Sequence, residues 1–327
     1  MTMTRRGLGG AALALLAAPA VRAQDAWPSR NIRFIVPFPP GGAADLVGRM
    51  LAQHLQGALG RPVVVENRGG AGSAIGVDAL AKSAPDGYTV GLVNIAANAI
   101  LPAIRRTPPP YRPVEDFAPI SNLAVTPALL LVNPQRLPDV RTVADFVAAA
   151  RARPDAINFG SSGVGSSLHL GMVLFAQRAG FSVTHVPFAG GGPLLQALIA
   201  GTIDASLDVA ATTHTMIADG RLRALATTAP QRLPAYPDLP ALNESFPGVE
   251  LASWHGFAAP AGTPAPVLAR LATETQRFLA AADTRERFRT LFLEMPRETT
   301  PDAFAAFMRR ELETFTALAR SANISVE

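Results

Sequence analysis

The segment Ile32–Asp45 constrains the fold more than any other, because it combines an apolar strand, a glycine turn and the start of a helix. It reads I-R-F-I-V-P-F-P-P-G-G-A-A-D. The apolar run at 32–36 suits a buried strand, and the prolines after it end the strand because proline cannot donate to a sheet ladder. Apolar residues then recur at helical spacing from Leu46 to Leu59. The segment therefore predicts a strand–turn–helix unit of an α/β protein.

The glycine turn before this helix has a chemical consequence. The first amides of a helix have no partner within it, and the helix dipole is positive at this end. Gly41 and Gly42 leave those N–H groups open to an anion, and the Asp45 carboxylate in the first turn can cap one free amide. We interpret this loop as a site for the carboxylate of a small ligand. The alternative is an ordinary turn that binds nothing.

The first 23 residues have the pattern of an export signal. Residues 4–8, T-R-R-G-L, match a twin-arginine core, and a short apolar region to Val21 leads to an A-x-A-like site at 21–23. We predict cleavage after Ala23, which leaves an exported, periplasmic protein that begins at Gln24. An uncleaved membrane anchor is the alternative, although the apolar run is short for a membrane span.

Charge and cysteine content exclude several classes of function. The chain has 29 basic and 25 acidic residues, but three of the arginines lie in residues 1–23, so the net charge of +4 falls to +1 after cleavage (26 against 25). This balance does not argue for nucleic-acid binding, which would need basic residues clustered on one face. Cysteine is absent, which excludes disulfides, thiolate nucleophiles and Cys-ligated metals.

The same strand–turn–helix pattern recurs and predicts two α/β units with parallel strands and helices on the sheet faces. The first unit continues with strands expected at 63–66 and 88–94 and helices at 73–83 and 96–104. The second has strands expected at 157–160, 182–186, 203–208 and 222–228 and helices at 142–153, 168–179 and 194–200. Long apolar segments at 120–133, interrupted at Pro127, and at 249–259 are the predicted crossovers. Helices at 264–281, 283–291 and 301–321 complete the chain.

Other chemistries find weaker support. The turns at 70–72 and 163–165 do not complete G-x-G-x-x-G, since Ile75 and Leu168 occupy the third glycine position and Gly76 comes one place late. No P-loop motif is present. The serines at 161–167 near His169 leave an exported serine hydrolase open, but a G-x-S-x-G elbow is missing. The remaining histidines have no metal-ligand spacing, and we interpret His185 as a core residue and Trp254 as a packing residue.

Ordered motifs along the mature chain carry a resemblance to a known family. They are W-P-S-R-N-I-R-F-I-V-P-F-P-P-G-G-A-A-D (27–45), R-P-V-V-V-E-N-R-G-G-A-G (61–72), A-P-D-G-Y-T (84–89), D-F-A-P-I-S (116–121), N-F-G-S-S-G-V-G-S-S-L-H-L (158–170), H-V-P-F-A-G-G-G-P (185–193), R-L-R-A-L-A-T-T (221–228) and W-H-G-F-A-A-P-A-G-T-P (254–264). With these motifs the chain resembles the Bug receptors, the exported solute-binding proteins of tripartite tricarboxylate transporters.

The resemblance implies a Venus flytrap with two α/β domains, of the type II-like class of periplasmic binding proteins. The crossovers would divide the chain into domain 1 at 24–124 plus 253–327 and domain 2 at 125–252. The ligand would be a small di- or tricarboxylate, acidic amino acid or aromatic acid, bound without cofactor, metal or catalysis by a monomer. Membrane transporter subunits, or a sensor kinase, would be its partners, and nucleic acid would not. The implied ligand-binding residues are Phe38, Pro39, Gly41, Gly42, Ala43, Asp45, Asn94, Ser161, Ser162, Gly165, Ser166, Ser167, His169, Ala189, Gly190, Gly191 and Asp208.

The sequence also departs from the family pattern near the implied site. Phe188 and Ala189 stand where Tyr-Lys is common, which removes a hydroxyl and a cation. His255 stands where tyrosine is common, and Val209 follows Asp208 where asparagine is frequent. These differences prevent the resemblance from naming one ligand.

Overall fold

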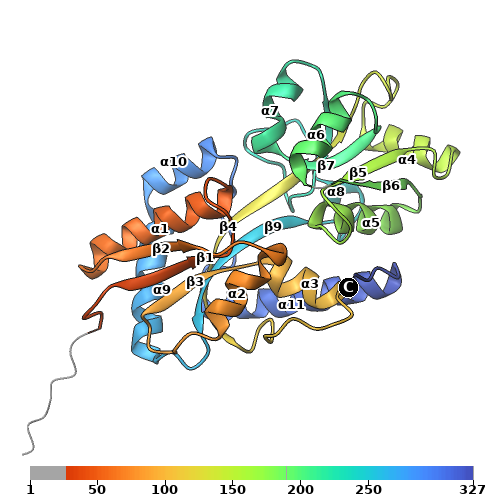
Figure 1. Cartoon of the computed structure of the whole chain (residues 1–327). Coiled ribbons are helices and arrows are strands. Elements are labelled where there is room, and N and C mark those ends of the chain that lie inside the picture. Colours follow the sequence, from red (N-terminus) through yellow and green to blue (C-terminus); the bar gives the residue numbers. More distant parts are fainter. Residues whose placement is uncertain (1–26, 189, 327) are drawn as a thin grey trace, which may run out of the picture.

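The computed structural model describes residues 27–188 and 190–326, so the predicted export signal, its cleavage site and Ala189 lie outside the described residues. In the described ranges the chain forms two lobes joined by two long strands, β4 (Phe117–Val132) and β9 (Ala252–Pro260) (Figure 1). None of the helices in these ranges is both long and apolar enough to cross a membrane.

Lobe 1 contains the strand–turn–helix units from the first part of the chain and the C-terminal helices. Its N-terminal elements are β1 (Ile32–Val36), α1 (Ala43–Leu59), β2 (Val63–Asn67), the 3-10 turn η1 (Ala71–Ser73), α2 (Ala74–Ala81), β3 (Thr89–Asn94), the π-helical turn η2 (Ala96–Ile100) and α3 (Leu101–Ile104). Its C-terminal helices are α9 (Ala265–Ala280), α10 (Ala282–Thr290) and α11 (Pro301–Ser321).

Lobe 2 lies between the two long strands in the chain order. Its elements are α4 (Val143–Ala152), β5 (Asn158–Ser161), α5 (Ser167–Ala179), β6 (Thr184–Pro187), α6 (Gly191–Ile199), β7 (Ala205–Val209), α7 (Ala210–Ala218), β8 (Arg223–Thr227) and α8 (Leu242–Ser245). The short helix α8 lies between the strand predicted at 222–228 and the crossover predicted at 249–259, where no helix was predicted.

Strand pairing makes the carboxyl ends of the two parallel sets face each other. The strand order is β2-β1-β3-β9-β4-β7-β5-β6, with β8 also paired to β4. β4 runs from lobe 1 into lobe 2, β9 runs back antiparallel to it, and β3 is antiparallel to β9, so β3 and its parallel neighbours point toward lobe 2. β7 is antiparallel to β4 and parallel to β5, so the strands of lobe 2 point toward lobe 1. The parallel sheets were predicted; the antiparallel pairing of the crossover strands within them was not.

The expected interruption at Pro127 is wrong. β4 is continuous through this residue, and Pro127 pairs with Ala252 of β9. The strand changes partners at the next residue, Ala128, which pairs with β7. Pro127 is tolerated because it stands where one neighbouring strand ends and the next begins, so the missing N–H does not break a ladder in the middle of a sheet. The domain boundaries at 124/125 and 252/253 stay a prediction.

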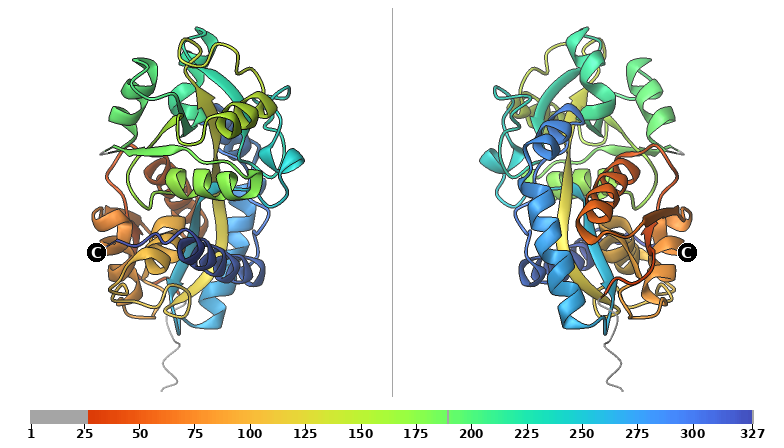
Figure 2. Two further views of the ribbon diagram at one scale, coloured as in Figure 1. Left: turned by 90° about the vertical axis from the view of Figure 1, so that its right-hand side faces the viewer. Right: turned by 90° about the vertical axis from the view of Figure 1, so that its left-hand side faces the viewer.

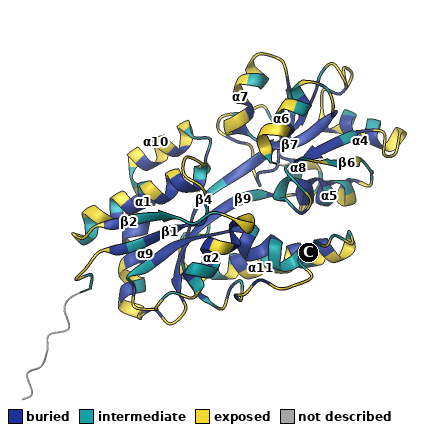
Figure 3. Cartoon of the chain, in the orientation of Figure 1, coloured by how far each residue is buried: buried dark blue, intermediate teal, exposed yellow. Residues whose placement is uncertain are grey.

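Apolar packing surrounds both halves of the sheet. The strands are largely buried, while the outer faces of the helices are exposed (Figure 3). Helix α5 of lobe 2 contributes Leu170 and Leu174 to a core that also contains Phe315 and Leu318 of α11, so the two lobes share apolar contacts on this side. In both views of Figure 2 the lobes lie one above the other, with β4 and β9 between them.

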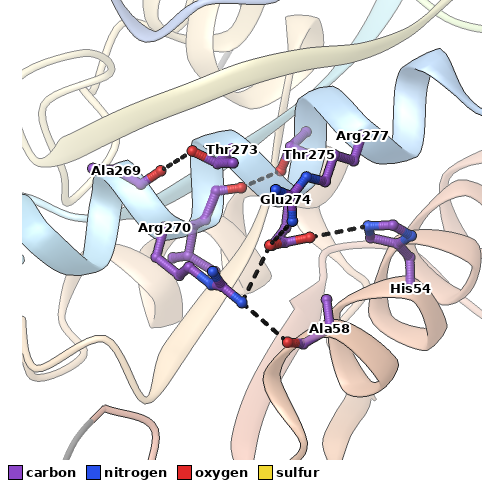
Figure 4. A network of polar contacts seen from close by, with 9 residues as sticks. His54, Ala58, Ala269, Arg270, Thr273, Glu274, Thr275 and Arg277 are labelled. Carbon is purple, nitrogen blue, oxygen red and sulfur yellow. Dashed lines mark hydrogen bonds and ion pairs between the residues drawn. The ribbon is translucent and has the colours of Figure 1, made fainter.

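A buried glutamate fixes α1 to α9 on the outer side of lobe 1. Glu274 is 1% exposed and forms ion pairs with Arg270 at 3.3 Å and Arg277 at 2.9 Å, and its carboxylate lies 3.6 Å from Nε2 of His54 in α1 (Figure 4). Arg270 also donates to the carbonyl oxygen of Ala58 at the end of α1. Because a buried carboxylate needs partners, this network defines how α1 lies on α9 and hence where α1 begins.

Candidate functional site

Asp45 holds the β1–α1 loop together from inside. Its side chain is buried; Oδ2 accepts from the Gly41 amide at 2.9 Å and from Arg49 Nε at 3.0 Å, and Oδ1 accepts from Asn67 Nδ2 at 2.8 Å. Burial alone would raise the pKa of Asp45, but the hydrogen bonds from Arg49, Asn67 and Gly41 outweigh it and hold this pKa below its usual value. Asn67 also donates to the carbonyl oxygen of Phe38. Asp45 thus shapes the loop, with both carboxylate oxygens already engaged.

The outer side of this loop presents the open amides at the start of α1. Gly42 is the N-cap and receives no side-chain capping bond, and the first intrahelical bond runs from the Leu46 amide to the Gly42 carbonyl. The amides of residues 43–45 therefore precede the helical ladder. Pro39, Gly41 and Gly42 are exposed, so this positive end of the helix dipole is accessible to an anion.

The loop between β5 and α5 satisfies several of its amide donors within the loop itself. Ser166 is the N-cap of α5, and its Oγ accepts from the His169 amide at 3.2 Å. The Gly165 amide donates to His169 Nδ1 at 3.1 Å, and the Gly163 amide donates to Ser161 Oγ at 3.3 Å. The amides that stay ahead of the helical ladder are those of residues 167 and 168.

Two stacked histidines lie beneath this loop. The rings of His169 and His185 have centroids 3.8 Å apart and are nearly parallel, and His185 Nε2 lies 2.7 Å from Ser161 Oγ. Burial, with a smaller contribution from His185, lowers the pKa of His169 to about 4, and burial also lowers the pKa of His185. Both rings are therefore largely neutral at neutral pH. His185 was interpreted as a core residue, but it is half-buried and supports the loop of the candidate site.

Gly165 places this loop directly against lobe 1. Its φ is +75°, and a Cβ at this position would overlap Cδ1 of Ile104 in α3. A side chain here would displace the end of the Ile104 side chain, and the left-handed backbone itself favours glycine at this position.

The other residues of the predicted site lie at the ends of strands that face the opposite lobe. Asn94 is 1% exposed, and its Oδ1 accepts from the Ser73 hydroxyl and from two amides at the start of η2. Asp208 is 5% exposed, and its Oδ1 accepts from the Val209 amide and the Thr212 hydroxyl. Burial raises the pKa of Asp208 to about 6. Gly190 and Gly191 start helix α6; Ser162 and Ser167 are half-buried in the β5–α5 loop region.

A cavity of about 400 Å³ lies away from these residues, between the crossover strands β4 and β9 on one side and α11 on the other. Its wall contains Glu311, which accepts a hydrogen bond from Trp254 Nε1 at 3.0 Å. Trp254 is 1% exposed and packs against Phe304 and Phe307, so its interpretation as a packing residue is confirmed. None of the predicted ligand-binding residues lines this cavity.

Comparison with known proteins identifies the family. The sequence model of one protein family, the tripartite tricarboxylate transporter family receptor, matches residues 47–318 of this chain. The chain belongs to this receptor family. BugT of Bordetella pertussis is 35% identical over 315 residues, which cover 94% of each protein. Among solved structures, R. palustris Rpa4515 with adipate shares 32% identity and a TM-score of 0.77 over 91% of this chain and 99% of that one. MatC from Rhodopseudomonas palustris with bound malate shares 31% identity and a TM-score of 0.72, covering 89% and 99%.

Membership in this family makes the chain a solute-binding receptor with a two-lobed flytrap fold, not an enzyme. The contact between Ser161 and His185 therefore belongs to the architecture of a receptor loop. In the described part of the chain, His, Asp and Glu side chains form no cluster suited to a metal ion.

Two further polar residues, which were not predicted, lie at the same place in the receptor fold. Thr126 of β4 and Ser253 of β9 are opposite each other in the pairing of the crossover strands, and Ser253 Oγ lies 3.4 Å from Ser167 Oγ at the start of α5. A signal was present, because each is a polar position in a largely apolar crossover segment. Alternation with period two would have assigned Ser253 and His255 to the same face.

Asp208 gives the receptor a predicted pH dependence of stability. Its pKa is raised from 3.8 to about 6, so between these values the folded state retains a proton that the unfolded state releases, and stability falls as the pH rises. We expect Asp208→Asn, which keeps an acceptor for Val209 and Thr212, to be more stable than wild type at pH 7 by about 2–3 kcal/mol. Thermal melts at pH 4 to 7 should show the two proteins converging at the acidic end. A constant difference at every pH would contradict the assignment.

Proposed function

We propose that this receptor captures a small carboxylate between its lobes in the periplasm and presents it to the membrane subunits of a tripartite tricarboxylate-type transporter. The observation that carries the proposal is that α1 and α5 begin at strand ends that point toward each other from opposite lobes. Both helix starts offer unpaired amides, and the histidines beside one of them are neutral. The adipate and malate bound to two relatives support the same class of ligand.

The arrangement also supports a mechanism of closure. An anion on the α1 amides gains the α5 amides only when the lobes approach, so the ligand binds the closed state more tightly than the open one. Such a difference in affinity shifts the population toward closure, which a membrane partner can recognise. The ligand-binding residues taken from the family resemblance, including Ala189 and Asp208, are part of this proposal.

A ligand screen tests the proposed function. The mature protein, residues 24–327, is heated with a panel of di- and tricarboxylic acids and, as a matched control, with the corresponding neutral amides. We expect acids to raise the melting temperature and their amides to leave it unchanged, because only a carboxylate gains from the two helix dipoles. The proposal fails if amides stabilise the protein as much as acids do, or if no acid has an effect.

One variant in the same screen examines the second helix start. Ser166→Ala removes the N-cap of α5 and should weaken binding of the acid that the screen selects, with the fold retained. Thr300→Ala is the matched control, because Thr300 caps α11 through the amide of Ala303 outside the proposed site. Equal affinities for both variants and the wild type would remove the α5 start from the site.

A further inference from the structure

Four polar side chains form a row on one face of the crossover region. Asn94 of β3 is paired with His255 of β9, and Ser253 of β9 is paired with Thr126 of β4. Directly paired residues project to the same face of a sheet, as do residues two apart on one strand. The neighbouring positions along β4 and β9 project to the opposite face, where they line the cavity against α11; they are Val125, Pro127, Ala252 and Trp254. We call Asn94, His255, Thr126 and Ser253 the polar row.

The polar row connects the two helix starts of the proposed carboxylate site. At one end the His255 ring meets the edge of Phe38 in the β1–α1 loop, with ring centroids 5.6 Å apart. At the other end Ser253 Oγ lies 3.4 Å from Ser167 Oγ, at the first residue of α5. A ligand held by both helix starts would therefore pass along the row.

Three atoms of the row are buried without a hydrogen-bond partner among the described residues. They are Asn94 Nδ2, Thr126 Oγ1 and His255 Nδ1, and their residues are 1%, 8% and 9% exposed. Buried polar groups in folded proteins are nearly always paired, and an unpaired one costs free energy. The grouping of three in one row, between two anion-binding helix starts, points to a ligand that supplies the missing partners.

The chemistry of the row selects the kind of group that fits. Asn94 Oδ1 accepts from the amides of Ala96 and Ala97, so Nδ2 is the donor. Burial lowers the pKa of His255 to about 4, so its ring is neutral at pH 7. A second carboxylate on the row would be buried without a counter-charge, and an ammonium group would face the Asn94 donor. A hydroxyl can accept from Asn94 and at the same time donate to His255 or Thr126.

We infer that this receptor selects hydroxycarboxylic acids, with a carboxylate on the helix starts and the hydroxyl on the polar row. The inference rests on the proposed function, because it places the second group of the same ligand. It also assigns His255 and Thr126 as residues that determine specificity.

Calorimetric titration with matched pairs of ligands tests the inference. The pairs are malate and succinate, 2-hydroxyglutarate and glutarate, and citrate and tricarballylate, with both enantiomers where they exist. In the pair that fits the receptor, we expect the hydroxy acid to bind at least about tenfold more tightly, since the deoxy acid leaves the row unpaired. If both members bind equally in every pair, the inference is wrong while the proposed function stands. If no acid binds, the proposed function itself fails.

Variants of the row separate recognition of the hydroxyl from a general effect on the fold. His255→Phe keeps a flat ring without nitrogens, and Thr126→Val keeps the shape without the hydroxyl. Each should reduce the ratio between the affinities for the hydroxy acid and the deoxy acid toward one, because the group that distinguishes the two ligands is gone. Thr275→Val is the matched control, because Thr275 is a buried threonine of α9 that donates to Leu271 outside the row. An undiminished preference in both row variants would overturn the assignment.

Discussion

Gly76→Ala is expected to destabilise the receptor by about 3 kcal/mol or more. A Cβ on Gly76 of α2 would lie 2.5 Å from the carbonyl oxygen of Arg68 and 2.7 Å from Cα of Pro37. These are main-chain atoms of two loops that meet over the helix, so no rotamer change relieves the overlap and the backbone must move. Because Pro37 leads into the β1–α1 loop, the same movement should disturb the amides at the start of α1. Chemical denaturation of both proteins measures the loss.

A second helical glycine supplies the control for this prediction. Gly57 lies in α1 with open space around its Cβ direction. Gly57→Ala should stabilise the protein by about 0.5–1 kcal/mol, because alanine loses less backbone entropy on entering a helix. If both variants change stability by the same amount, the effect at Gly76 comes from helix propensity and the close packing argument is wrong.

Asp45→Ala is expected to lower both stability and affinity. The change leaves the Gly41 amide and Asn67 Nδ2 without their acceptor and releases Arg49, so we expect a loss of about 2–3 kcal/mol. The loop that carries the first helix start then loses its internal support, and the affinity for the selected acid should fall by at least about tenfold. Denaturation and calorimetric titration of the same samples measure the two effects.

The pH dependence gives an independent check on Asp45. In the folded state the pKa of the Asp45 carboxyl lies below its ordinary value of 3.8. Its contribution to stability is therefore complete above a pH of about 4 and is lost as the pH falls through the lowered value. The difference between wild type and Asp45→Ala should shrink below pH 4. Asp145→Ala is the control, since Asp145 accepts from the amides of Arg141 and Thr142 at the exposed start of α4, and it should leave ligand affinity unchanged.

Much of the fold could be predicted because each helix and strand has a local cause. The box formed by Thr142 and Asp145 starts α4 as expected, with the Asp145 amide bound to Thr142 Oγ1. Glycine turns mark the starts of α1 and α6, and apolar runs mark the strands. Pro127 was misjudged because the rule that proline ends strands is local, whereas its tolerance depends on which strand lies beside it.

The candidate site could be predicted only in part. Position relative to strand ends indicated the two loops. The carboxylate of Asp45 was expected to cap a free amide of the helix start, but it accepts instead from the amide of Gly41, which precedes the N-cap Gly42. The role of Gly76 could not be seen, because the G-x-G-x-x-G comparison considers spacing and not the loops that pack on the helix. The stacking of His169 on His185 likewise depends on two residues from different elements.

By itself, the amino-acid sequence determined that this protein is an α/β protein with glycine turns leading into helices, because periodicity, proline and glycine act over a few residues. Only the tertiary structure decided which polar groups remain free. Asp45, Gly163 and Gly165 use their hydrogen-bonding groups within their own loops, whereas Asn94, Thr126 and His255 keep atoms unpaired on one face of the crossover strands. The reason is physical: a hydrogen bond depends on the distance and direction of groups far apart in the chain, and these follow from the pairing of strands.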